Sequence, residues 1–194
     1  MPRMTAAESA KTADRILQVA VARFSTDGYT GASLDDIAGD AGVTRGAVYH
    51  HYRDKPGLLR AAVLEGHTRV AAYVVDRAEA HSDPADQLRA GCHAFIEAIT
   101  RTDTARLLLL EAPAALGWAT WRELDAATSG RELHDAIAAL PGTRDVDSLT
   151  QLLSGAMNEA ALWLVDRSGD PETRAAVHRS LDLLLTAVTG PAER

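Results

Sequence analysis

Residues 33–55 contain the polar side chains whose types and spacing best suit recognition of DNA. Arg45, Tyr49 and His50 can project from one short helix, and Gly46 would let another backbone come close to that helix. A helix of this kind can lie in the major groove, where its side chains contact base edges and phosphates. The chemistry that these residues favour is therefore binding, and not the cleavage of a bond.

Two short helices joined by a glycine turn are predicted to position these side chains. Ser33 can cap the first helix, because its hydroxyl can accept a hydrogen bond from a free amide of the first turn. Gly42 follows at the point where a left-handed residue commonly ends a helix, and Thr44 can cap a second helix over residues 45–52. The apolar face of the first helix consists of Leu34, Ile37, Ala38 and Ala41. This pattern predicts a helix-turn-helix.

With these residues in place, residues 12–59 resemble the tetracycline-repressor (TetR) family of bacterial transcription regulators. The family's pattern is matched in order by Ile16, Leu17, Ala20, Phe24, Gly28, Tyr29, Ser33, Asp36, Ile37, Ala38, Ala41, Gly42, Val43, Tyr49, His51, Tyr52 and Lys55. Small departures from the usual residue types occur at Ala32, Tyr52 and Pro56. Beyond residue 59 the resemblance is one of architecture only.

The resemblance implies which residues contact DNA. Ser33 and Lys55 would hold phosphates on either side of the recognition helix. The full implied set is Ser33, Thr44, Arg45, Gly46, Ala47, Tyr49, His50 and Lys55. His51 is expected to pack or to bond the backbone instead of contacting bases. The alternative for any one of these residues is an ordinary solvated helix surface.

The composition is that of a globular protein. Of the 194 residues 46% are hydrophobic, which is enough for one mid-sized domain or two small ones. Cys92 is the only cysteine, so no intrachain disulfide can form, as suits a reducing compartment. The amino terminus lacks the apolar core of a secretion signal, and the leucine run at 107–110 is too short to span a bilayer. We expect a cytoplasmic protein.

The net charge of −7 is distributed unevenly along the chain. Residues 1–55 contain seven basic and seven acidic side chains, so their net charge is zero. Residues 56–194 contain 13 basic and 20 acidic side chains and therefore carry the entire net charge of −7. An acidic second part repels the DNA backbone, so binding to non-specific DNA should be weak. Useful occupancy of DNA would need two recognition helices on one duplex, which favours a dimer.

The rest of the sequence predicts helices, so we expect an all-α protein with two domains. Residues 1–55 would form the helix-turn-helix DNA-binding domain, and residues 56–194 a helical effector-binding and dimerisation domain. The first helix expected in the second domain covers 56–81, and Ser82, Asp83 and Pro84 open the next one. A third helix is expected over 103–112, with interruptions at Pro113 and Gly117, and a fourth over 118–140, with a possible break at 128–130. The last two expected helices cover 146–166 and 171–188.

The last two predicted helices carry broad apolar stripes. In the family that the chain resembles, this terminal pair forms a four-helix bundle with its copy in a partner subunit. The stripe residues are Leu149, Leu152, Leu153, Ala156, Ala160, Trp163, Leu164, Val177, Leu181, Leu184, Leu185 and Val188. The alternative is that both stripes only cover the core of their own subunit.

The middle helices are interpreted as the walls of a small-molecule pocket, because family members typically enclose an inducer there. The candidate lining residues are Cys92, His93, Phe95, Ile96, Ile99, Leu107, Leu110, Trp118, Trp121, Met157 and Asn158. Trp118 and Trp121 are one helical turn apart and would suit a planar ligand. For each of these residues taken alone, plain core is the simpler interpretation.

No arrangement of residues predicts catalysis or a resident cofactor. Cys92 and His93 are neighbours, so on a helix they point about 100° apart and cannot form a simple metal pair.

Taken with the resemblance, the sequence predicts a homodimeric transcription factor, most simply a repressor that a small molecule releases from a palindromic operator. Two alternatives stay open: a regulator of the same fold that activates or answers to a protein partner, and a helical enzyme or metal carrier.

Overall fold

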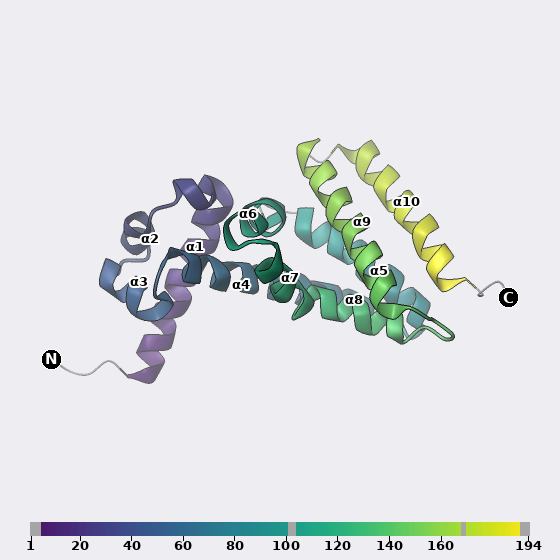
Figure 1. Cartoon of the computed structure of the whole chain (residues 1–194), viewed down its shortest axis with the longest axis horizontal. Coiled ribbons are helices and arrows are strands. Elements are labelled where there is room, and N and C mark those ends of the chain that lie inside the picture. Colours follow the sequence, from purple (N-terminus) through teal and green to yellow (C-terminus); the bar gives the residue numbers. More distant parts are fainter. Residues whose placement is uncertain (1–4, 101–103, 168–169, 191–194) are drawn as a thin grey trace. The chain divides into compact units, whose positions relative to one another are not determined.

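A computed structural model of the chain describes residues 5–100, 104–167 and 170–190 (Figure 1). Within these residues the chain forms ten α-helices, one π-helical segment and no β-strand, which confirms the expected all-α class. In chain order the elements are α1 (Ala6–Gly31), α2 (Leu34–Asp40), α3 (Arg45–Tyr52), α4 (Lys55–Ala78), α5 (Pro84–Thr100), the π-helix η1 (Arg106–Glu111), α6 (Ala112–Leu116), α7 (Trp118–Ala126), α8 (Ser129–Ala138), α9 (Val146–Asp166) and α10 (Pro171–Thr189).

The chain divides into two compact units. The first, which we call the head, comprises Met1–Gly66 and Arg106–Trp121, and the second, the body, comprises His67–Ala105 and Arg122–Arg194. Helix α4 is continuous and contributes residues to both units. The boundary after residue 55 stays a prediction for the functional domains.

The core of the head is built by the first three helices together with buried residues of α4 and η1. Ile16, Ala20 and Phe24 of α1 are fully buried, as their spacing along one helix face predicts. Gly28 is the one residue inside α1 with non-helical dihedrals, at φ 73°, so the first helix bends at this glycine. The amide that follows, that of Tyr29, donates to Oε2 of Glu111 at 2.8 Å. A residue 82 positions away thus fixes this bend.

The helix that contains the leucine run at 107–110 continues further than predicted. Pro113 does not interrupt the helical path, because η1 passes directly into α6 and Pro113 lies in the first turn of α6. Proline is tolerated there, since its missing amide would have no intrahelical partner. The predicted stop at Gly117 is confirmed, with φ 81° at the end of α6. Residue 103, the expected start of this helix, lies outside the described residues.

The body is a set of packed helices that includes α5, α8, α9 and α10. The bounds of α9 and α10 agree with the predicted 146–166 and 171–188 to within one residue. The Asp170 carboxylate caps α10 by accepting from the Thr173 amide at 2.8 Å. The expected break near 128–130 separates α7 from α8. Among the described residues no helix is long and apolar enough to cross a membrane.

Candidate functional site

The turn between α2 and α3 has the geometry that the sequence predicts. Gly42 adopts φ 60°, a left-handed conformation that favours glycine. The Val43 amide donates back to the Ala38 carbonyl at 2.9 Å, which closes the end of α2. Both predicted caps are confirmed, because Ser33 accepts from the Asp36 amide at 3.0 Å and Thr44 accepts from the Ala47 amide at 3.2 Å. Local sequence signals alone therefore define this motif.

Helix α3 presents one exposed polar face, which we call the reading face. It consists of Thr44, Arg45, Gly46, Tyr49 and His50, all of them exposed. Val48 points the other way and is 1% exposed, so it anchors α3 in the head. The three other predicted DNA contacts, Ser33, Ala47 and Lys55, are half-buried. Contact of any of these residues with DNA stays a prediction.

Arg45 is held in place before any DNA arrives. Its Nη1 donates to Oδ2 of Asp35 at 2.8 Å, and its Nη2 donates to the Tyr49 hydroxyl at 3.1 Å. The guanidinium carbon also lies 5.4 Å from the centre of the Tyr49 ring, within cation–π distance. The hydrogen bond with Tyr49 and the charge of Asp35 raise the pKa of Arg45. The reading face thus carries a permanent, oriented cation.

Lys55 stands over an aromatic ring at the start of α4. Its Nζ lies 4.6 Å from the centre of the Tyr29 ring, so a cation–π contact restrains the ammonium group. This contact joins the bend of α1 to the start of α4. It gives Lys55 a structural role beside the predicted phosphate contact.

Gly57 is a functional position that the sequence reasoning missed. The chain turns so tightly between α3 and α4 that a Cβ at Gly57 would lie 2.3 Å from the Tyr52 carbonyl oxygen. The Gly57 amide also donates to Oδ1 of Asp54 at 2.7 Å. The only local signal was the pair Pro56-Gly57 directly after Lys55. Glycine at this position sets how closely α3 and α4 approach.

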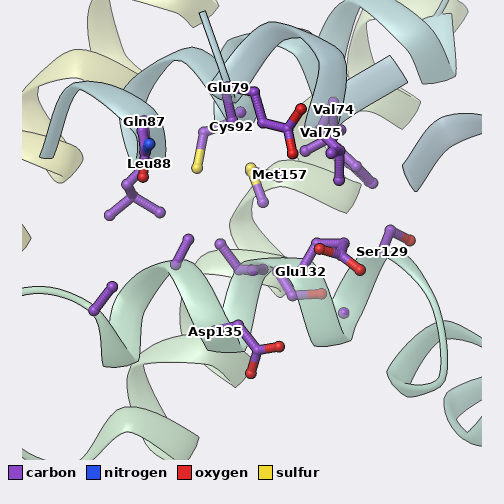
Figure 2. A pocket seen from close by; sticks show the side chains of 18 of the residues that line it. Val74, Val75, Glu79, Gln87, Leu88, Cys92, Ser129, Glu132, Asp135 and Met157 are labelled. Atoms are coloured by element: carbon purple, nitrogen blue, oxygen red, sulfur yellow. The ribbon is translucent and has the colours of Figure 1, made fainter. Parts of the chain in front are cut away.

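The body contains a cavity of about 350 Å³, a size typical of small-molecule sites. Helices α4, α5, α7, α8 and α9 all contribute to its wall. The lining residues are Val74, Val75, Ala78, Glu79, Gln87, Leu88, Gly91, Cys92, Phe95, Asp125, Ser129, Gly130, Glu132, Leu133, Asp135, Ala136, Ala139, Ser154 and Met157. Figure 2 shows that the sulfur atoms of Cys92 and Met157 both point into the cavity. Burial raises the pKa of the Cys92 thiol to about 12, so it stays protonated.

The structure brings together only three of the eleven predicted ligand-binding residues. Cys92, Phe95 and Met157 line the cavity. The other eight do not line it: His93, Ile96, Ile99, Leu107, Leu110, Trp118, Trp121 and Asn158. Ile96 and Ile99 are fully buried core. Whether any of the eleven contacts a ligand stays a prediction.

The two tryptophans belong to the head, not to the cavity wall. The Trp121 indole N–H donates to the Leu108 carbonyl at 2.6 Å and its side chain is buried. Trp118 is 67% exposed, and the two ring centres are 4.8 Å apart. Their spacing of one helical turn agrees with this ring contact, but it did not indicate which unit the two side chains stabilise.

Asp125 is the most enclosed carboxylate of the cavity, with a side chain 6% exposed. It pairs with Nη1 of Arg122 at 3.0 Å and accepts from the Ser129 hydroxyl at 3.3 Å. Nδ1 of His67 lies 3.9 Å away, and Nε2 of His67 is buried with no hydrogen-bond partner in the described part of the chain. Burial lowers the pKa of His67, and the charge of Asp125 opposes that shift.

A second polar cluster joins α5 to α10. Nδ1 of His93 lies 2.6 Å from Nδ1 of His178, and Nε2 of His93 lies 2.9 Å from Oδ1 of Asp182. Arg89 also reaches Asp182, at 2.7 Å. Burial and the neighbouring His93 lower the pKa of His178. This cluster explains why His93 points away from the cavity: its partners are on α10.

The structure separates the predicted dimerisation residues into buried, exposed and half-buried ones. Leu153, Leu164, Val177, Leu181 and Leu185 are buried in the body itself. Leu152, Ala156, Trp163 and Leu184 are exposed, Leu149, Ala160 and Val188 are half-buried, and Leu183, which the prediction omitted, is 75% exposed. We call the group formed by Leu152, Ala156, Trp163, Leu183 and Leu184 the α9–α10 face. The two helices lie side by side (Figure 1).

Two sequence families match the chain. Residues 16–62 match the family described as bacterial regulatory proteins, tetR family. Residues 85–188 match the tetracyclin repressor-like C-terminal domain. The first match contains the reading face, and the second contains most of the cavity wall and the α9–α10 face.

Individual relatives agree with these matches. The transcriptional regulator SrpR of Pseudomonas putida is 48% identical over 63 residues, which cover 32% of this chain and 30% of SrpR. The transcriptional repressor Rv1474c of Mycobacterium tuberculosis is 34% identical over 68% of this chain and 70% of its own length. A solved TetR-family regulator from Pectobacterium atrosepticum superposes with a TM-score of 0.75 at 28% identity, covering 97% of this chain and all of that one. The chain thus spans under a third of SrpR.

Proposed function

Because the chain belongs to the TetR family of bacterial regulatory proteins, we propose that it is a homodimeric transcriptional repressor that a small molecule releases from a palindromic operator. Regulators of this family bind DNA operators and small-molecule ligands and work as dimers. The observation that carries the proposal is the reading face, where Arg45 and Tyr49 are exposed, paired and oriented on a short capped helix. The site of action would be the cytoplasm, where the DNA is.

The α9–α10 face supports the dimer. Leu152 is 73% exposed and Leu183 is 75% exposed, on two helices that contact each other. A second copy of the same face would bury these side chains, and each buried leucine contributes roughly 1.5–3 kcal/mol. An interface of this kind has two-fold symmetry, which matches a palindromic operator.

Helix α4 supports the link between ligand and DNA. It begins at Lys55, close to the reading face in sequence, and Val74, Val75 and Ala78 near its other end line the cavity. A ligand that prefers one position of α4 would shift the spacing of the two recognition helices. A ligand with equal affinity for both positions would shift nothing.

Selection from random duplex DNA on the purified protein, at two salt concentrations, tests the DNA-binding part. We expect an enriched palindrome, and we expect Tyr49→Ala to lose about 1–3 kcal/mol of binding to it. Arg144→Ala is the control, because it removes an exposed cation from the loop between α8 and α9. No enrichment at low salt, or equal binding by Tyr49→Ala, would contradict the proposal.

A further inference from the structure

The cavity in the body has charged groups of one sign only. Four carboxylates line it, those of Glu79, Asp125, Glu132 and Asp135. No lysine, arginine or histidine is among the described residues of its wall. We propose that the ligand of this cavity is an organic cation, an apolar molecule that carries an ammonium group. This inference rests on the proposed function, because it identifies the chemical class of the effector.

Glu79 is the carboxylate best placed to bind the charge. It follows α4 directly and is exposed, and within the described residues it forms no ion pair. Figure 2 shows its side chain at the cavity, among the labelled lining residues. A cationic ligand would supply the partner that the protein does not.

The other three carboxylates already have partners of differing strength. Asp125 is neutralised by Arg122 at 3.0 Å. Among the described residues, the ion-pair partner of Glu132 is Arg131 at 3.5 Å, and the Arg131 side chain is 62% exposed. Asp135 lies 3.2 Å from His134 and is itself 67% exposed. Negative charge therefore remains at Glu79 and Glu132, on two different parts of the wall.

The rest of the wall suits the apolar part of such a ligand. Phe95 offers an aromatic ring, which attracts an ammonium group through the cation–π effect. Leu88, Val74 and the sulfurs of Cys92 and Met157 supply polarisable apolar surface. Beside such a low-dielectric wall a carboxylate attracts a cation more strongly than in open water.

The same wall disfavours an anion. A carboxylate or phosphate ligand would find no basic side chain in the described lining, and it would lie close to Glu79 and Glu132. An anion buried without a partner is costly. In addition, residues 56–194 carry the whole net charge of −7, which attracts cations to this part of the chain and repels anions.

The experiment compares three probes of equal chain length on the full-length protein by calorimetry: decyltrimethylammonium, decanoate and decanol, each below its micelle concentration. We expect the cation to bind about tenfold more tightly than either of the other two. Tighter or equal binding of decanoate or decanol would overturn the inference.

Variants then locate the charge. Glu79→Gln keeps the shape of the side chain, and we expect it to weaken binding of the cation about three- to tenfold while binding of decanol is unchanged. Glu172→Gln, at an exposed carboxylate on α10, is the matched control and should change neither. Equal loss of cation and decanol binding in Glu79→Gln would overturn the role of charge. Ala136→Phe fills the cavity, so a cation that still binds to this variant would place the site elsewhere and overturn the proposal.

Release of the selected operator separates this inference from the proposed function. Operator binding without any probe tests the proposed function alone. If operator binds and decanol releases it more effectively than the cation does, the cation inference fails and the repressor stands. If no operator is selected, the repressor fails, and the calorimetry still decides which ligand class the cavity binds.

Discussion

The reading face and the cavity recognise their targets with opposite geometry and opposite charge. The reading face is formed by residues within one short helix and its cap, all exposed, with a guanidinium at its centre. The cavity wall comes from five helices and holds four carboxylates, one of them almost fully buried. A long polyanion can be met by a protruding face, whereas a small molecule must be surrounded. The two ligands that we propose, DNA and an organic cation, would therefore bind at separate places on one chain.

The largest expected effect comes from removing the dimer on which the reading face depends. Leu152→Glu combined with Leu183→Glu places charges on the α9–α10 face, and we expect the dimer dissociation constant to rise at least about 100-fold. Analytical ultracentrifugation measures this, and operator binding should fall with it. Leu110→Glu changes an exposed leucine of the head and is the control. A double variant that stays dimeric would show that the α9–α10 face is ordinary surface.

The next effect tests how the reading face is positioned. Gly57→Ala forces a Cβ against the Tyr52 carbonyl oxygen, so we expect it to destabilise the head by about 1–3 kcal/mol. Hydrogen exchange of peptides from residues 45–66 measures this locally. Gly39→Ala is the matched control, because nothing lies within 4 Å of a Cβ there and alanine favours the helix. If both variants are equally stable, the tight turn between α3 and α4 does not constrain the head.

A variant of Lys55 tests whether this residue contacts a DNA phosphate beside the reading face. Lys55→Gln should weaken binding to all DNA sequences by about the same factor and reduce the slope of log K against log salt by about 1. Binding titrations at four salt concentrations measure the slope. Lys11→Gln, at an exposed lysine on α1, is the matched control. An unchanged slope with weaker binding would mean that the contact of Lys55 with the Tyr29 ring is its main role.

The smallest effect concerns the buried histidine beside the cavity. Burial lowers the pKa of His67 below its ordinary value of 6.5, so the unfolded chain takes up a proton before the folded one does. The corresponding stability is present above about pH 6.5 and is lost as the pH falls toward the lowered pKa. We expect the free energy of unfolding of the body to drop by about 1 kcal/mol between pH 7 and pH 5.5.

Urea unfolding at several pH values measures this dependence. His67→Gln should flatten it, because the titrating group is gone. His134→Gln removes a much more exposed histidine and should leave the dependence unchanged. A wild-type slope in the His67→Gln protein would assign the dependence to other groups, of which His178 is the first to examine, because burial and the neighbouring His93 lower its pKa.

The head could be predicted from the sequence because its signals are local. Ser33, Gly42 and Thr44 each act within three or four residues, through a cap or a turn, so their types alone specify the motif. Gly57 escaped prediction, because the oxygen that excludes a side chain belongs to Tyr52, on the preceding helix. A clash of this kind depends on an interhelical distance, which no residue pattern encodes.

The cavity was predictable in kind but not in composition. Periodicity showed that Ile96 and Ile99 face a core, but core and cavity wall share the same residue types. Four of the five helices that line the cavity contribute polar residues, such as Gln87, Asp125 and Ser129, and Glu79 follows the fifth helix, α4. Polar residues of this kind look like surface residues in the sequence. Leu183 was omitted for a similar reason, since it lies off the apolar stripe that covers the core of its own subunit.

The pairing of Arg45 with Asp35 has a consequence for how selectively the protein chooses among DNA sequences. Nη1 of Arg45 already donates to the Asp35 carboxylate in the unbound protein, so a DNA acceptor that bonds Nη1 would have to replace Asp35. The gain from that predicted contact would then be a difference between two partners, and a sequence that offers a poorer acceptor than Asp35 would gain little from it. An internal competitor of this kind would reserve the contribution of Nη1 for the best-matched operators.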